Sequence, residues 1–134
     1  MGTNYYWTHI SNKCSCCGRA DKETKHIGKS SAGWVFGLHV YPEEGIHDLP
    51  DWKRLLEQPD TIIEDEYGDV HSAESMLRCI TERSWPHAKH LTPTHLSQNH
   101  AVVGPSNLLR AELNPQWCIK HGEGTWDCRI GEFS

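Results

Sequence analysis

The residues best suited to chemistry lie near the N-terminus, where Cys14 and Cys17 form a Cys-x-x-Cys pair. Such a turn presents two thiolates to one point, which supplies half of a tetrahedral zinc site. His26 and His39 follow on two segments that the sequence predicts to be extended, and a hairpin would bring both rings to the cysteines. We therefore predict a zinc site with the ligands Cys14, Cys17, His26 and His39. Four protein ligands leave no open position, so the predicted Zn²⁺ is structural.

A second ligand set stays open, in which Cys118 and Cys128 replace the two histidines. The intervening glycines predict a hairpin, and a loop from Gly122 to Gly124 would place the two cysteines opposite each other. The alternative is a pair of buried thiols in van der Waals contact, because free cysteine packs as a small apolar residue. A disulfide is not expected, since thiols stay reduced in the cytoplasm.

These side chains must be positioned by a small fold. The chain has 134 residues, which fits one zinc-stapled domain over 1–134. Helices are expected from Pro50 to just before Pro59 and from Ser72 through Arg83. A polar turn over 18–25, a bend of small residues over 28–33 and a turn over 65–69 are also expected. Strands are predicted at 4–10, 25–27, 34–41, 61–64, 108–113, 116–120 and 125–133.

The fold class predicted from these elements is α+β, with a small, mostly antiparallel sheet, two helices and one structural zinc knuckle. Residues 86–107 lack periodicity and contain four of the histidines, from His87 to His100. We predict a His-rich loop or insertion there.

Composition narrows the classes of function. The net charge is −5 with neutral histidines, so no overall basic field exists to hold nucleic acid. The chain has no apolar run long enough to cross a membrane and no signal-peptide core at its N-terminus, so we expect a cytoplasmic protein. A nucleic-acid-binding zinc-ribbon module remains an alternative that is not favoured. Its only basic cluster is Lys13, Arg19, Lys22, Lys25 and Lys29.

A phosphate loop is incomplete in this sequence. Residues 28–30 read Gly-Lys-Ser, but the position of the earlier glycine of that motif holds Glu23. The residues that follow predict a strand where the motif requires a helix. A nucleotide site is therefore not expected.

An HNH-like metal-dependent nuclease is a further alternative. His100, Asn107 and His121 could act as general base, orienting amide and metal ligand. Their spacing matches such sites poorly, and no second cysteine pair braces them. Solvated loop histidines are the simpler interpretation.

Several stretches of the chain carry a resemblance to a known family. They are the opening MGTNYY, the Cys14/Cys17 knuckle with the following Gly-Arg, the segment HIGKSSAGW from His26 and the closing GEFS. Together they resemble small zinc-knuckle proteins encoded by bacteriophages, a family from which no activity can be transferred. The resemblance implies a phage protein in the bacterial host cytoplasm, where small proteins often bind and inhibit host factors. The function that we favour is therefore a non-enzymatic one, in which the protein binds and modulates a host protein or defence complex. An acidic chain suits a partner with a basic groove.

Overall fold

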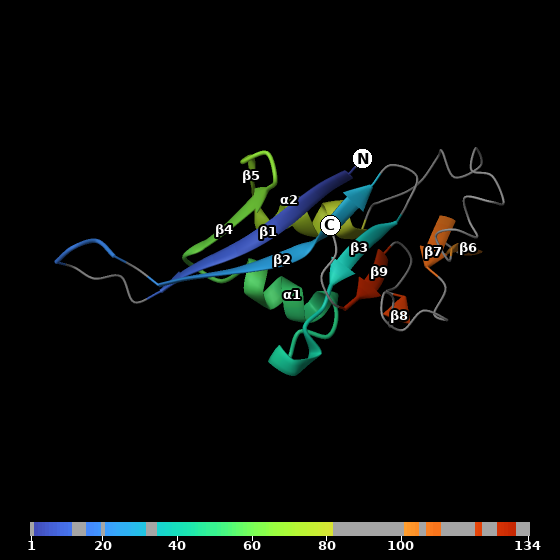
Figure 1. The fold of residues 1–134 in the computed structure, drawn as a ribbon, viewed down its shortest axis with the longest axis horizontal. Helices are drawn as coiled ribbons and strands as arrows, with labels where there is room; N and C mark the ends of the chain where they lie inside the picture. Colours follow the sequence, from blue (N-terminus) through green and yellow to red (C-terminus); the bar gives the residue numbers. More distant parts are fainter. Residues whose placement is uncertain are drawn as a thin grey trace.

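The computed structural model describes residues 2–11, 16–19, 21–31, 35–81, 101–104, 107–110, 120–121 and 126–130. Within them, seven strands form one sheet in the order β5-β4-β1-β2-β3-β9-β8, and β6 pairs separately with β7 (Figure 1). The elements are β1 (Gly2–Ser11), β2 (Asp21–Ser31), β3 (Phe36–His39), η1 (Pro42–Glu44), α1 (Leu49–Leu56), β4 (Thr61–Asp65), β5 (Val70–His71), α2 (Ala73–Thr81), β6 (Ala101–Gly104), β7 (Asn107–Arg110), β8 (Lys120–His121) and β9 (Trp126–Arg129).

The expected α+β class with two helices is confirmed, but the sheet is mixed. β3 and β9 run parallel, whereas the other neighbouring strands of this sheet run antiparallel. A parallel pair needs a long crossover, and here the chain between β3 and β9 includes both helices.

None of the helices that the structure describes is long and apolar enough to cross a membrane.

Strand β2 is longer than the sequence predicts. The expected turn over 18–25 and bend over 28–33 are both wrong in part, because β2 runs from Asp21 to Ser31 against β1. Its residues at 28 and 29 also pair with β3, so ladders on both sides hold a segment of small residues in extended form. Pairing with neighbouring strands has overridden local propensity.

A bulge interrupts the β1–β2 ladder beside the predicted ligand His26. Tyr5 pairs with Gly28, but Tyr6 pairs with His26, so Ile27 is an extra residue in β2. Ile27 is fully buried in the core. Bulges re-aim neighbouring side chains, and this one directs His26 toward Tyr6 and Asn4 of β1.

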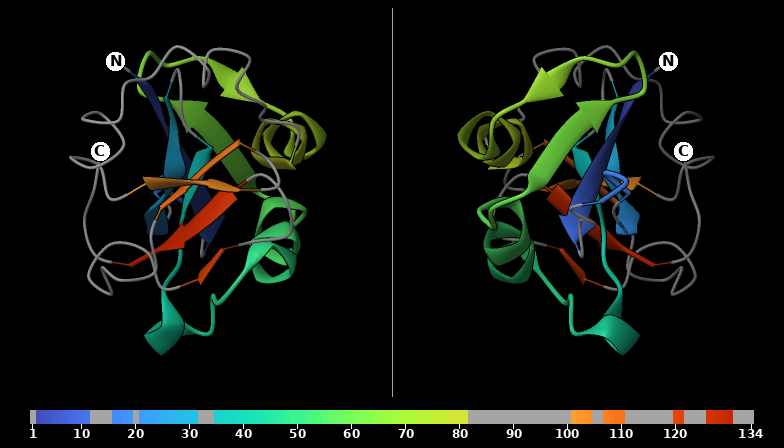
Figure 2. Two further views of the ribbon diagram at one scale, coloured as in Figure 1. Left: turned by 90° about the vertical axis from the view of Figure 1, so that its right-hand side faces the viewer. Right: turned by 90° about the vertical axis from the view of Figure 1, so that its left-hand side faces the viewer.

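Both helices lie on the same side of the sheet, where they close the core (Figure 2). Two buried tryptophans satisfy their ring N–H groups on backbone oxygens, as buried indoles require. Trp7 Nε1 donates to the Leu55 carbonyl at 3.0 Å, and Trp52 Nε1 donates to the His39 carbonyl at 2.6 Å. The main buried apolar side chains are Trp7, Ile27, Phe36, Leu38, Val40, Trp52, Leu56, Ile63, Met76 and Ile80.

Side-chain caps mark the starts of both helices, although only the cap at Ser72 was expected. Asp48 accepts a hydrogen bond from the Leu49 amide at 2.7 Å at the start of α1. The hydroxyl of Ser72 accepts one from the Ser75 amide at 3.0 Å at the start of α2. Both helix starts are confirmed to within a residue, while the expected last two residues of the second helix, 82–83, lie outside the described residues.

The C-terminal part of the chain is described only in its strands. The predicted loop 86–107 is wrong at its end, because 101–104 forms β6 and β7 begins at Asn107. Residues 86–100, with the four histidines of that stretch, lie outside the described residues. The predicted hairpin is confirmed by the antiparallel pairing of β8 with β9.

Candidate functional site

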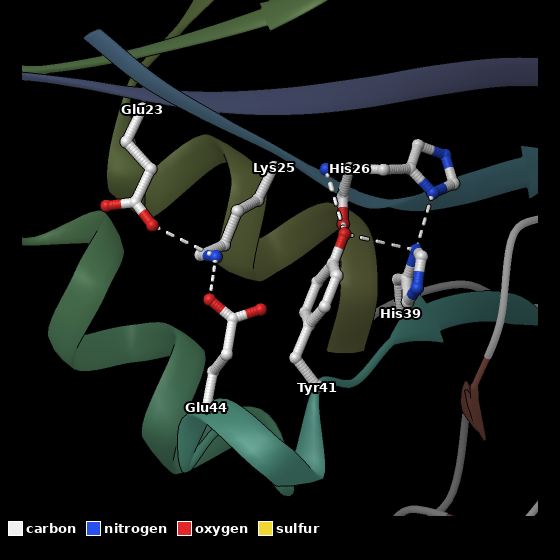
Figure 3. Close-up of polar contacts among 6 residues, drawn as sticks. All are labelled: Glu23, Lys25, His26, His39, Tyr41 and Glu44. Carbon is white, nitrogen blue, oxygen red and sulfur yellow. Dashed lines mark hydrogen bonds and ion pairs between the residues drawn. The ribbon is translucent and has the colours of Figure 1, made fainter.

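The structure brings together two of the four predicted zinc ligands. His26 on β2 and His39 on β3 approach with their Nδ1 atoms 3.0 Å apart (Figure 3). The rings meet edge-on, at an interplanar angle of 72° and a centroid distance of 5.3 Å. Two extended segments do place these side chains side by side, as the sequence predicts.

Of the two predicted cysteine ligands, the structure places only Cys17, and it does not lie beside the histidines. Cys14 lies outside the described residues, and Cys17 is exposed in the turn beyond the last β1–β2 pair, Ser11 with Asp21. At about 3.3 Å per residue, the strand from Asp21 to His26 spans roughly 16 Å, and the hairpin tip lies far from β3 (Figure 1). The described residues contain no group of three or more His, Cys, Asp or Glu side chains able to hold a metal ion. The four-ligand zinc site stays a prediction.

The alternative cysteine pair is not formed as expected. The register of β8 with β9 places Lys120, rather than Cys118, opposite Cys128. His121 pairs with Asp127, so the connection is longer than the three-residue loop that would align the cysteines. Cys118 lies outside the described residues, and Cys128 is fully buried with its thiol 3.8 Å from an Asp48 carboxylate oxygen.

A chain of hydrogen bonds fixes the tautomers of the histidine pair. Asn4 Nδ2 donates to Glu66 Oε1 at 3.3 Å, which turns Asn4 Oδ1 toward His26 Nε2 at 2.8 Å. His26 Nε2 must then carry the proton, so a neutral His26 presents a lone pair at Nδ1. His39 Nδ1 therefore donates to His26 Nδ1. The order of donation runs from His39 through His26 to Asn4 and ends at Glu66.

The side chain of Tyr41 satisfies the backbone of His26 where the β2–β3 ladder ends. The β2–β3 ladder pairs only Gly28 and Lys29 with β3, so it does not reach His26. The Tyr41 hydroxyl takes over there: it accepts from the His26 amide and donates to the His26 carbonyl, each at 3.1 Å. Its ring stacks on His39 at a centroid distance of 4.2 Å. The hydroxyl of Tyr41 thus replaces the two backbone hydrogen bonds that a further residue of β3 would form with His26.

Replacing Tyr41 with phenylalanine should therefore destabilise the fold by about 1–3 kcal/mol, because a half-buried backbone N–H and C=O both lose their partner. Urea denaturation followed by tryptophan fluorescence measures this change. Tyr67→Phe is the matched control, since Tyr67 is 70% exposed and should lose almost nothing. Equal stability of the two variants would contradict the role assigned to the Tyr41 hydroxyl.

Both histidines are neutral at neutral pH. Burial lowers the pKa of His26 to about 4, and the neighbouring His39, Arg129 and Lys29 act in the same direction. Burial likewise lowers the pKa of His39 to about 4, reinforced by Arg129, which lies opposite it on β9, and partly opposed by Glu43. Neutral imidazoles are the form that binds metal ions.

The basic cluster expected from the sequence is partly neutralised. Lys25 forms ion pairs with Glu23 and with Glu44 of η1, and its ammonium lies 5.1 Å from the centre of the Tyr41 ring (Figure 3). Burial alone would lower the pKa of Lys25, but the hydrogen bonds to Glu44 and Glu23 raise it overall. Lys25 is therefore committed to packing η1 against β2 rather than to a nucleic-acid surface.

A second site, which sequence reasoning missed, lies on the hairpin of β4 and β5. We call residues 61–71 the acidic hairpin. Tyr67 and Val70 are each 70% exposed, and they are the exposed large hydrophobic side chains among the described residues. The sequence predicts the turn over 65–69, but a predicted turn does not indicate which of its side chains are exposed in the folded protein. The only sequence signal is an aromatic residue inside a turn of charged residues.

The turn of the acidic hairpin is held rigidly by one carboxylate. Asp65 accepts hydrogen bonds from the Tyr67 amide at 2.9 Å, the Asp69 amide at 3.1 Å and His71 Nε2 at 2.9 Å. The bond from His71 is the main cause that lowers the pKa of Asp65, while burial opposes it. Gly68 completes the turn with φ of +88°, a conformation that glycine adopts without strain.

The remaining sequence candidates are not assembled in the described residues. Residues 28–30 lie within strand β2, an extended segment in place of the loop and helix start that a phosphate loop requires. Of the nuclease candidates, Asn107 is on β7 and His121 is on β8, and these strands belong to different sheets. His100 lies outside the described residues, so the nuclease arrangement stays untested.

The candidate site thus has two parts, the histidine pair on β2 and β3 and the acidic hairpin, which Glu66 and Asn4 connect. Neither part carries a motif that assigns an activity. No family model matches the chain, and no curated protein and no solved structure is significantly similar to it.

Proposed function

We propose that this protein is a non-enzymatic binding protein of phage type that modulates a basic host protein, and that it binds through the acidic hairpin. The observation that carries the proposal is the exposure of Tyr67 and Val70, 70% each, on the same hairpin. Elsewhere in the described residues, large apolar side chains are buried or half-buried. Exposed aromatic anchors are characteristic of binding surfaces.

Rigidity supports a binding role for this hairpin. The Asp65 carboxylate holds two amides of the turn, and the Glu66 amide donates to the Asn4 carbonyl at 2.9 Å. The Glu66 side chain accepts from the Asn4 amide at 2.8 Å, which ties the turn to β1 from both directions. A turn fixed before binding loses little conformational entropy when a partner docks, and this increases affinity.

Charge supports a basic partner. Glu64 pairs with Val70 across the hairpin, and Glu66 and Asp69 directly precede the two apolar residues, in a chain whose net charge is −5. Opposite potentials accelerate association and select against acidic partners. The resemblance to phage proteins supplies the setting, the bacterial host cytoplasm, where a nucleic-acid-binding defence complex offers such a basic surface.

The direct test is capture of a host protein from bacterial lysate, followed by affinity measurement with purified partner. The double variant Tyr67→Ser, Val70→Thr should bind at least tenfold more weakly, because loss of an aromatic anchor costs about 2 kcal/mol or more. Capture that is equally strong with this variant would contradict binding through the hairpin.

A matched pair of charge variants separates local from overall electrostatics. Glu64→Gln with Asp69→Asn removes two charges from the acidic hairpin, whereas Glu57→Gln with Asp60→Asn removes two from the exposed segment before β4. The first pair should slow association more than the second, and raised salt should reduce the difference.

The nuclease alternative has its own assay. Plasmid incubated with the protein and Mg²⁺ or Mn²⁺ should stay intact if the proposed function is right. Cleavage that His100→Ala abolishes would replace the proposal with an HNH-like activity.

A further inference from the structure

The approach of His26 and His39 has the geometry of an incomplete metal site. Two imidazole nitrogens bound to one tetrahedral Zn²⁺ at about 2.0–2.1 Å lie roughly 3.3 Å apart. The two Nδ1 atoms are already 3.0 Å apart, and the rings meet by their edges. To bind an ion, the two nitrogens must separate by a few tenths of an ångström, and both rings must turn so that their Nδ1 lone pairs point to one ion beside the line that now joins the two atoms. We propose that His26 and His39 bind one late first-row transition-metal ion through their Nδ1 atoms, without the Cys14 and Cys17 thiolates.

The surroundings of His26 match those of a metal ligand. A ligating histidine typically gives its other ring N–H to a fixed acceptor, which sets the tautomer and the ring orientation. His26 Nε2 has this arrangement with Asn4 Oδ1 at 2.8 Å, and Glu66 in turn holds the Asn4 amide. The bulge at Ile27 gives the ring its direction. The lone pair of His26 Nδ1 is therefore already aimed at His39.

His39 is held equally firmly. Its backbone carbonyl accepts from Trp52 Nε1, and its ring stacks on Tyr41. The Tyr41 hydroxyl oxygen lies 3.3 Å from His39 Nδ1, which places an oxygen atom beside the proposed position of the ion. For His39 to bind through Nδ1, its proton leaves that atom and Nε2 takes one up, so the ring stays neutral. The net charge of the protein then changes only by that of the ion.

The local charges indicate which ions fit. Arg129 and Lys29 place positive charge near the pair, and Glu43 offsets it only partly. Mg²⁺ and Ca²⁺ require oxygen ligands and are excluded by a site made of two imidazoles. Zn²⁺, Ni²⁺ and Cu²⁺ bind imidazole well. Repulsion by Arg129 weakens the affinity, but the same guanidinium favours an anion as a further ligand of the bound ion.

Titration of the full-length, chelator-treated protein with Zn²⁺ and Co²⁺ tests the proposal. We expect one ion bound by the pair, with a Co²⁺ spectrum that shows d–d bands but no thiolate charge-transfer band for that ion. His26→Gln or His39→Gln should each weaken binding at least tenfold. Cys14→Ser with Cys17→Ser should leave this binding unchanged, and so should His47→Gln, which alters an exposed histidine.

Side-chain nitrogen NMR of the wild-type protein provides a test that needs no variant. Zn²⁺ should shift the Nδ1 resonances of His26 and His39 together. A second ion that only the cysteine variants remove would agree with the proposal, provided that the histidine signals still shift. Absence of any shift, or binding that the cysteine variants abolish entirely, would overturn it.

Discussion

Gly28→Ala should destabilise the protein by about 3 kcal/mol or more, a large effect for a single methyl group. A Cβ at this position would lie 2.1 Å from the Gly37 carbonyl oxygen and 2.5 Å from the Phe36 ring. Neither neighbour can move easily, since Gly37 is in the β3 backbone and Phe36 is fully buried. Urea denaturation measures the loss, and a fully unfolded variant would agree with it.

Gly45→Ala is the appropriate control for this substitution. Gly45 has φ of +80°, and a Cβ there would meet no atom within 4 Å. Its replacement should cost only the strain of a left-handed conformation, about 1–2 kcal/mol. If both alanine variants lose the same free energy of unfolding, the close packing of Phe36 over β2 is not the reason for glycine at 28.

The metal-free protein should lose about 3 kcal/mol of stability between pH 7 and pH 4.5, as His26 and His39 become protonated on unfolding. Both have pKa values of about 4 in the fold, against 6.5 when unfolded. Between these values the unfolded chain binds more protons, so the free energy of unfolding falls as the pH falls. If the pKa shifts of both rings contributed in full, the loss of stability would be larger. His26 is partly exposed, however, and solvent screening reduces its contribution.

Denaturation at a series of pH values, with chelator present, checks this expectation. The double variant His26→Gln, His39→Gln should flatten the curve between pH 6.5 and 4 relative to wild type, even if it is less stable at pH 7. Asp65 cannot produce the same slope, because its lowered pKa places its contribution below about pH 4. An equally steep curve in the double variant would show that other groups cause the loss.

Local features of the fold were predictable because they depend on residues close in sequence. Pro50, the cap at Ser72 and the turn over 65–69 each act within about four residues, and the structure has them where the sequence predicts them. Aromatic and β-branched residues also predicted the strand at 4–10, and the alternation of apolar residues predicted the strand that contains β3. Segments 28–31 and 101–104 were missed, because their extended form comes from neighbouring strands.

The candidate site shows the same division. The sequence by itself determined that His26 and His39 lie on adjacent extended segments, since two short strands joined in sequence pair readily. Only the tertiary structure decided that Cys17 lies beyond Asp21, which is itself roughly 16 Å of strand away from His26, because the length of a strand is set by its partners. The parallel entry of β9 beside β3 brings Arg129 to the histidine pair from a distant part of the chain. Exposure of Tyr67 and Val70 likewise depends on what the folded chain leaves uncovered, which no local pattern specifies.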